Sequence, residues 1–362
     1  MLGKKGHWAL TVNGDDILGE ELIFLNMFET VGLNLPTLAM LFYTTDEDKV
    51  KRWSEPGYPV EIGFGIDTIE DVSTFKCFSR KVSSIGGGDQ WSVELKAIYD
   101  SLDYVNKQLT NVYNTWGDMK KSSEVFSTVV TRNGFKPDVP VPSNDIMLWT
   151  QYNITDRKLL EEVVWHGFFS INDPCLSALR KDAKAIYKPL SKIITGVKGI
   201  IGNSEDASII ANSFTLNNNE GFLSSWGGDI REIPHHHSEK GIDDFDKGSV
   251  TPKVVRTSGL TPSLEKYQEI ELLNDNVHDH WWEAYRQNRQ FRSSLSSQVM
   301  RVTSDEYTSI FPLDYYRTKF LRQDDKTLLA PYSGKWIVSD VVTSVKDSAF
   351  TQHISLSRET LL

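Results

Sequence analysis

The chain has 362 residues, a formal net charge of −10, a hydrophobic content of 39% and 10 Trp. This length exceeds one ordinary hydrophobic core and predicts two or three domains. The hydrophobic content, with 11% aromatic residues, indicates a folded rather than a disordered chain. The acidic balance argues against general binding of nucleic acid or anionic membrane, because such binding depends on clustered Lys and Arg. The two cysteines, Cys77 and Cys175, exclude a disulfide framework and a cysteine-rich zinc site. They fit assembly in a reducing cytoplasm.

No targeting signal is recognisable at the start of the sequence. Residues 1–7 are basic, but Asn13, Asp15 and Asp16 follow closely, so no signal-peptide apolar region forms. No run of about 18 apolar residues occurs anywhere, which predicts that the chain has no membrane-spanning helix.

The first hundred residues show the two-residue period of half-buried strands. Apolar side chains alternate with other side chains in 37–42, 60–66 and 91–97, a further strand is expected at 75–82, and turn residues occupy 55–58 and 86–89. Short strands with such turns predict an antiparallel barrel or sandwich over residues 1–105. Gly63 and Gly65, inside a strand, indicate a bend or a close backbone approach.

Residues 106–200 have a different pattern. Helical spacing runs over Ser122–Asn133, and Ser122, Ser123 and Glu124 resemble a capped start. Three prolines then form an extended connector. The residues Thr155–Val164 begin a second amphipathic helix, with Thr155 or Asp156 as its N-cap. This segment predicts a mixed α/β domain.

Residues 196–264 are rich in Gly, Asn, Ser and Asp, which predicts a long loop of functional or interacting character. Strands within it are expected at Ser208–Leu216 and Asp229–Ile233. A helix from about Asn276 to Ser297 follows. The strand pattern then returns at Met300–Thr303 and Tyr315–Leu321.

The last thirty residues predict a long β-hairpin, with arms from Ser333 to Val338 and from Phe350 to Glu359 and a polar turn at Lys346-Asp347-Ser348. Phe350, Ile354 and Leu356 fall on one face of the second arm.

The elements together predict a fold class that is mainly β with an α+β middle. Two antiparallel β-barrel domains, 1–105 and 201–362, flank the mixed domain 106–200, and the second barrel carries a long loop and helix insertion.

Candidate catalytic residues are few. His235, His236 and His237 are adjacent and point in different directions on a coil, and His278 and His280 are two apart, which puts them on roughly opposite faces of a helix. Neither set matches the spacing of a zinc protease. The run with Asp243, Asp244 and Asp246 lacks the closing Glu of a calcium loop.

No nucleotide-binding or nucleophile motif occurs, and Gly86-Gly87-Gly88 fits a hairpin turn better than a phosphate cradle. We therefore predict no catalytic, cofactor-binding or metal-binding residues. The alternative is a carbohydrate-active or metal-dependent hydrolase that uses the His- and Trp-rich segment 226–282, with Trp281-Trp282 as a sugar platform. Metal analysis of the purified protein separates the two hypotheses.

Several motifs, in their order along the chain, resemble central baseplate hub proteins of contractile bacteriophage tails and the related front half of type VI secretion spike proteins. The matching segments are Gly57–Ile62, Phe75–Val82, Trp91–Ile98, Gln151–Leu160, and Tyr332–Val338 with Thr351–Glu359. Trp336 and Glu359 depart from the usual hairpin, which has Tyr and Asp there, and residues 196–297 match poorly. These motifs belong to barrel strands and a helix start rather than to an active site.

The resemblance implies a structural virion protein rather than an enzyme. A homotrimer with two similar barrels in each chain would present six barrels and adapt the six-fold tail tube to the three-fold spike. The implied partners are the tube protein, the spike protein and other baseplate proteins. DNA would pass through the lumen without specific binding, because an acidic lumen repels phosphates. We expect assembly in the host cytoplasm, a place in the tail baseplate of the virion, and a spike formed by a separate protein.

Overall fold

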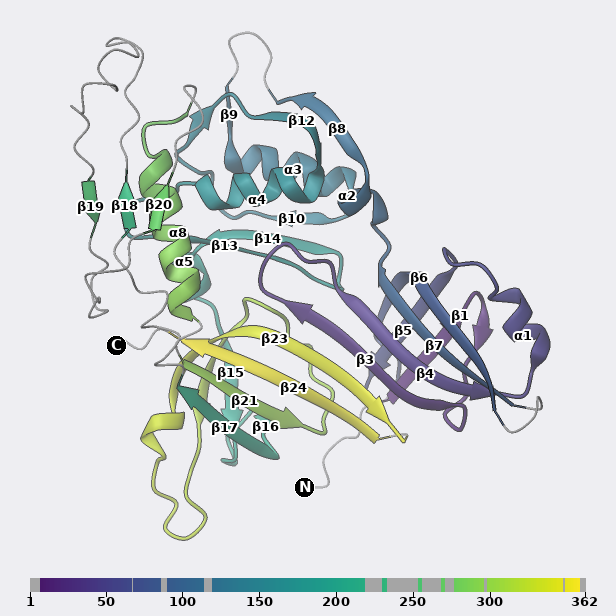
Figure 1. Cartoon of the computed structure of the whole chain (residues 1–362). Helices are drawn as coiled ribbons and strands as arrows, with labels where there is room; N and C mark the ends of the chain where they lie inside the picture. The colour runs from purple at the N-terminus through teal and green to yellow at the C-terminus, as the bar shows by residue number, and fades with distance from the viewer. Residues whose placement is uncertain are drawn as a thin grey trace.

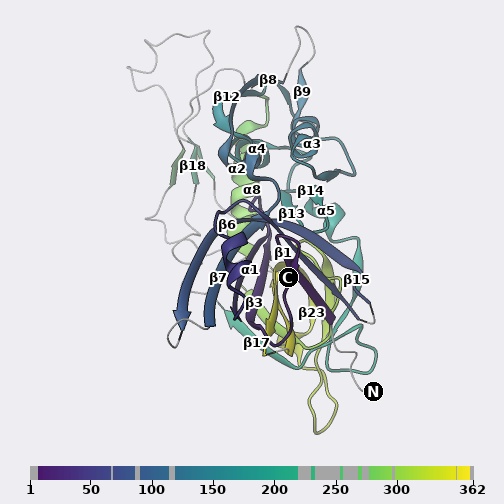
Figure 2. The same ribbon diagram turned by 90° about the vertical axis from the view of Figure 1, so that its right-hand side faces the viewer.

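The computed structural model describes residues 7–66, 68–85, 90–113, 119–218, 230–232, 253–255, 268–270, 277–295, 298–347 and 349–358. The chain is mainly β, and its largest element is one curled sheet of 14 strands (Figure 1). A layer of helices and short strands lies along one side of this sheet. Figure 2, turned by 90°, shows how the sheet curls around its interior.

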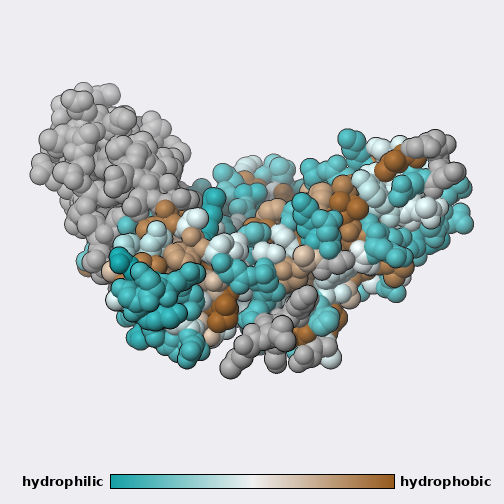
Figure 3. Space-filling view, turned by 90° about the horizontal axis from the view of Figure 1, so that it is seen from below, coloured by the Kyte–Doolittle hydropathy of each residue, from teal (hydrophilic) through white to brown (hydrophobic). Residues whose placement is uncertain are grey.

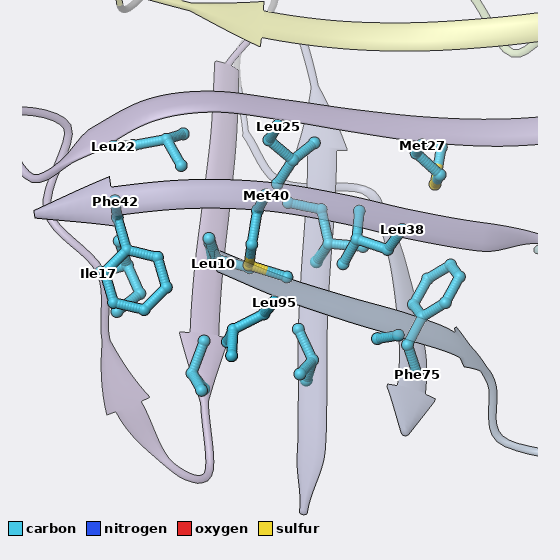
Figure 4. Close-up of a cluster of buried hydrophobic side chains, with 14 of the residues drawn as sticks. Leu10, Ile17, Leu22, Leu25, Met27, Leu38, Met40, Phe42, Phe75 and Leu95 are labelled. Carbon is cyan, nitrogen blue, oxygen red and sulfur yellow. The ribbon is translucent and has the colours of Figure 1, made fainter. Parts of the chain in front are cut away.

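The N-terminal half of the sheet has the strand order β3-β4-β7-β6-β5-β1-β2. The bounds are β1 His7–Val12, β2 Asp15–Asp16, β3 Leu22–Thr30, β4 Thr37–Thr44, β5 Pro59–Gly65, β6 Asp71–Ile85 and β7 Gln90–Tyr99, with helix α1 Glu47–Arg52 beside them. Leu38, Met40 and Phe42 of β4 point into one hydrophobic core (Figure 4). The predicted strands of this half are confirmed, whereas the predicted turn at 86–89 lies outside the described residues.

Gly63 and Gly65 of β5 lie where the following loop folds back over the strand. A Cβ atom on Gly65 would lie 1.6 Å from the carbonyl oxygen of Thr68, and one on Gly63 would lie 2.3 Å from Cγ2 of Ile69. Real Cβ atoms do not approach other heavy atoms this closely, so only glycine fits without movement. The predicted close backbone approach is confirmed.

We expect Gly65→Ala to lower the free energy of unfolding by about 2 kcal/mol or more, because the clash is with backbone that cannot rotate away. Gly196→Ala is the matched control, since its Cβ would lie 3.9 Å from the nearest atom. We expect Gly196→Ala to change the free energy of unfolding by no more than about 0.5 kcal/mol. Urea unfolding followed by circular dichroism measures both, and equal losses would contradict the steric explanation.

The C-terminal half of the sheet is built around β15, β22, β23, β24, β21 and β17. The bounds are β15 Val197–Gly202, β16 Ile209–Ile210, β17 Ser213–Asn218, β21 Gln298–Ser304, β22 Tyr315–Lys319, β23 Gly334–Lys346 and β24 Ala349–Arg358, with the 3₁₀ turn η1 at Ala330–Tyr332. β15 runs parallel to β22 and β16, which differs from the all-antiparallel barrel that we expected. The parallel pairing of β15 with β22 needs a long crossover, and the chain between these two strands supplies it.

The predicted terminal hairpin is confirmed, and it joins both halves of the sheet. The first residues of β23 pair with β22 and its last residues pair with β3, while β24 pairs with β21 and β23. Val345 and Phe350 belong to the N-terminal core, and Trp336 and Ile354 belong to the C-terminal core. The hairpin that we expected to help complete the second barrel therefore contributes to both cores.

The mixed layer covers one end of the sheet (Figure 1). Its elements are α2 Leu102–Asn106, β8 Gln108–Val112, β9 Lys120–Lys121, α3 Ser122–Arg132, β10 Lys136–Asp138, β11 Ile146–Met147, β12 Thr150–Thr155, α4 Asp156–His166, β13 Cys175–Leu179, β14 Lys184–Pro189 and α5 Leu190–Ile193. The two predicted helices are confirmed as α3 and α4. Of the two candidate N-caps for α4, the cap is Thr155, whose Oγ1 accepts from the Lys158 amide at 3.3 Å.

The predicted helix near 276–297 is α8, Trp281–Leu295, and it packs against α4 rather than on the sheet face alone. Its Asn288 is fully buried; Oδ1 accepts from the Cys175 amide at 2.8 Å and Nδ2 donates to the Gly167 carbonyl at 2.9 Å. Three short strands, β18 Ile230–Glu232, β19 Lys253–Val255 and β20 Gln268–Ile270, form a separate sheet. None of the described helices is long and apolar enough to cross a membrane.

Candidate functional surfaces

The His- and Trp-rich segment 226–282 is described only in part. Outside the described residues lie His235–His237, Asp243, Asp244, Asp246 and the side chain of Trp282. His278 and His280 are described, at the start of α8. His278 Nε2 donates to the carbonyl oxygen of His166 at 2.8 Å, and the His280 ring stacks on Phe168 with ring centroids 4.1 Å apart.

These rings join α8 to α4. His166, the last residue of α4, stacks face to face on Trp281 with ring centroids 3.5 Å apart and an interplanar angle of 8°. Trp281 also contacts Trp149 at a centroid distance of 5.9 Å. In the part of the chain that the structure describes, no group of three or more His, Cys, Asp or Glu side chains could hold a metal ion. The described His and Trp side chains therefore form a packing contact between two helices.

The packing contact predicts a dependence of stability on pH. Burial lowers the pKa of His166 from its ordinary 6.5 to about 3, and burial also lowers the pKa of His278. Between pH 6.5 and 3 the unfolded chain binds more protons than the folded chain, so the stability decreases as the pH falls. For His166 this loss is at most about 1.4 kcal/mol per pH unit.

Thermal unfolding followed by Trp fluorescence at pH 7.5 and pH 5 measures this loss. The matched variant is His166→Phe, which keeps a ring on Trp281 but cannot titrate. We expect its midpoint to change less between the two pH values than that of the wild type. An equal change in both proteins would show that His166 does not cause the dependence.

Both cysteines are buried. Burial raises the pKa of both thiols, and it raises the pKa of Cys175 to about 12. A cysteine attacks a substrate or binds a metal as the thiolate. Neither thiol is therefore suited to nucleophilic chemistry near neutral pH.

The Gln151–Asp156 motif forms a hydrogen-bonded centre within the mixed layer. Arg132 Nε donates to Asp156 Oδ2 at 2.7 Å, and Gln151 Nε2 donates to Asp156 Oδ1 at 2.8 Å. The Tyr113 hydroxyl donates to Gln151 Oε1 at 2.9 Å. Burial alone would raise the pKa of Asp156, but hydrogen bonds from Arg132, Asn133 and Gln151 hold it below 3.8. The motif ties β12 to α3 and to the start of α4.

A second buried carboxylate, Asp145, was not singled out from the sequence. It accepts from the Ser122 amide at 2.8 Å, from the Ser122 and Ser143 hydroxyls at 2.5 Å each, and from the Phe168 amide at 2.7 Å. Helix α3 begins at Ser122 as predicted, but its N-cap is Lys121, and Asp145 lies 23 positions further along the chain than Ser122. No local pattern signals a pairing over that separation.

The turn between β13 and β14 reaches between the two halves of the sheet. The Arg180 guanidinium lies 3.8 Å from the ring centre of Phe311 in the C-terminal half. The Lys181 amide donates to Glu29 Oε1 at 2.9 Å, and Lys181 Nζ lies 5.0 Å from the ring centre of Phe64, both in the N-terminal half. Such cation–π contacts strengthen when they are desolvated. The turn therefore connects the mixed layer to both halves of the sheet.

Glu29 is buried at this junction, and burial raises its pKa to about 7 while the nearby Lys181 and Arg180 act in the opposite direction. Its second oxygen, Oε2, has no hydrogen-bond partner among the described residues. The carboxyl group is therefore partly protonated near neutral pH, which limits the cost of burying it.

The outer surface is mixed in character. Seen from below in Figure 3, apolar patches are small and are separated by hydrophilic side chains. A groove of about 400 Å³ lies beside the Arg180–Ala183 turn. We call it the acidic groove, because its lining has four carboxylates, Glu70, Asp71, Asp100 and Asp182, and one cation, Lys181.

Comparisons with known proteins place this fold. No protein-family model matches the chain, and no curated protein matches it. A 43 kDa tail protein of prophage MuSo2 from Shewanella oneidensis has a TM-score of 0.62 at 13% identity, with 98% of each chain covered. A tail protein from Neisseria meningitidis has a TM-score of 0.60 at 8% identity, covering 98% of this chain and 97% of that one.

A third solved structure is the E. coli c3393 protein, a type VI secretion component described as structurally similar to the T4 tail proteins gp27 and gp5. It has a TM-score of 0.52 at 10% identity and covers 97% of this chain and 77% of its own. The predicted resemblance is thus confirmed at the level of fold. Over nearly its full length, the chain has the fold of phage tail proteins and of a type VI secretion component.

Proposed function

We propose that this chain is the central hub of a phage tail baseplate and acts as a structural virion protein. The observation that carries the proposal is the similarity of fold to two tail proteins over 98% of the chain. The similarity to a type VI component that resembles gp27 and gp5 extends the same argument to hub and spike proteins. Fold similarity alone does not fix function, so an experiment on tails has to test the proposal.

The proposed assembly is a homotrimer in the virion tail. We infer that residues 1–105 and 201–362 act as two barrel-like tube domains around the mixed domain 106–200. Each half of the sheet has a hydrophobic core of its own, with Val345 and Phe350 of the terminal hairpin in the N-terminal one, and these two cores support two barrel-like units. Three copies would present six such domains to the tail tube and a three-fold face to the spike, and DNA would pass through the lumen.

Quantitative mass spectrometry of purified tails, with electron microscopy of the same particles, tests the proposal. The expected result is three copies of this chain in each tail, located at the baseplate. Deletion of its gene should leave host lysates without complete tails. Tails that assemble without this protein, or that do not contain it, would refute the hub function.

We further propose that the protein binds no structural or catalytic metal and has no hydrolase activity. The support is that His278 and His280 are occupied in hydrogen bonds and ring stacking. The test is metal analysis of protein that was never exposed to a nickel column. Stoichiometric zinc or iron that disappears in a His278→Ala variant would overturn this proposal and favour the metal-dependent hydrolase.

A further inference from the structure

Two cations face each other on the outer side of the C-terminal half of the sheet. Arg317 of β22 and Lys335 of β23 are direct partners in the antiparallel register, and both are exposed. Neither lies within 4.0 Å of a carboxylate among the described residues. Like charges directly opposite one another destabilise a sheet. An acidic surface in contact with this pair would remove that cost.

Exposed apolar side chains occur on the elements next to β22: Val197 on β15, Ile210 on β16 beyond it, and Ile194 at the end of α5. Ile194, Val197 and Ile210 are 42%, 41% and 39% exposed, and Val197 pairs with the strand that carries Arg317. We call Ile194, Val197, Ile210, Arg317 and Lys335 the basic face. Two cations among apolar side chains suit a protein partner better than a nucleic acid, whose binding sites are far richer in positive charge.

The acidic groove has the complementary composition. Val72 and Ile69 beside it are 62% and 37% exposed. Glu70 has no ion-pair partner among the described residues, and Asp100 forms only an exposed ion pair, with Lys76 at 3.8 Å. Carboxylates next to exposed apolar side chains are thus available to a cationic, partly apolar partner.

We propose that the acidic groove of one copy receives the basic face of a second copy, and that this contact closes the ring. The inference rests on the proposed hub function and names the contact surfaces of its trimer. The two faces differ, so the contact is head to tail, and such a contact forms a closed ring when the rotation between copies allows it. Strands β6 and β15, which belong to the two faces, lie on opposite sides of the view in Figure 2.

The test is analytical ultracentrifugation of the full chain at 0.1 and 0.5 M NaCl. We expect wild-type trimers to dissociate at high salt, and we expect Arg317→Glu with Lys335→Glu to weaken association about 100-fold at low salt. Arg301→Glu is the matched control, because Arg301 is an exposed cation on β21 of the same sheet, outside the basic face. It should associate like the wild type, and near-ultraviolet circular dichroism should show an unchanged fold for all three proteins.

A rescue variant tests the pairing directly. Adding Glu70→Lys and Asp100→Lys to the Arg317→Glu, Lys335→Glu chain reverses the sign of the charges on both surfaces. We expect this variant to form trimers again. Wild type that stays monomeric, a double variant that associates normally, or a failed rescue would overturn the inference. Tails that incorporate three copies of the double variant would also overturn it and leave the hub function intact. Tails that lack the wild-type protein would refute the hub function itself.

Discussion

Ile354→Asp is expected to abolish folding of the C-terminal half of the sheet and, with it, formation of the proposed trimer. Ile354 is 1% exposed and lies in the C-terminal core, where β24 pairs with both β21 and β23. An unpaired carboxylate there costs about 4 kcal/mol or more, which is a large part of the stability of a typical domain. Urea unfolding measures the first effect, and light scattering in the presence of the proposed tube and spike partners measures the second.

The matched control for Ile354→Asp is His353→Asp. His353 is the preceding residue of β24 and is exposed on the opposite face of the strand. Its substitution introduces the same carboxylate without burying it, so we expect a change within about 1 kcal/mol and normal assembly. If Ile354→Asp left fold and assembly like those of the wild type, the proposed hub function would be wrong.

Asp145→Ala is expected to lower the free energy of unfolding by about 3 kcal/mol or more. The substitution leaves the Ser122 and Phe168 amides buried without the acceptor that Asp145 provides, and it removes the acceptor of the Ser122 and Ser143 hydroxyls. A buried donor without a partner costs about 1–3 kcal/mol, and here several are left at once. Thermal and urea unfolding measure the loss.

Asp138→Ala is the matched control for Asp145→Ala. Asp138 is 38% exposed and pairs with Lys188 at 2.6 Å in the same layer. A solvated ion pair contributes about 0–1 kcal/mol, so its loss should be small. Equal effects of the two substitutions would show that the Asp145 hydrogen bonds do not stabilise the mixed layer.

The sequence by itself determined the strands and helices that depend on residues close together in the chain. The alternation of β4, β5 and β7 follows from which face of each strand is buried, and that pattern is written in neighbouring residues. The start of α4 depends on Thr155 and Lys158, three positions apart. The terminal hairpin has an apolar face and a polar turn. The resemblance to phage tail proteins in fold could also be predicted, because the motifs that show it lie in such strands and at such a helix start.

Only the tertiary structure decided which distant elements meet. The hairpin could be predicted, but not that β23 divides its length between β22 and β3. The parallel run of β15 beside β22 depends on the path of the chain between them, and strand alternation is the same for either direction. The position of α8 against α4 depends on Asn288 and on the rings of His166 and Trp281.

The candidate functional surfaces likewise include some that the sequence predicts and others that only the tertiary structure shows. Sequence spacing argued against a metal site at His278 and His280, because ligand sets need regular separations. It showed neither the acidic groove, whose Glu70 and Asp182 come from different layers, nor the pairing of Arg317 with Lys335 across two strands. Local sequence patterns reflect interactions between residues that are close together in the chain. Contacts between distant segments are set by packing, which brings together residues that share no local pattern.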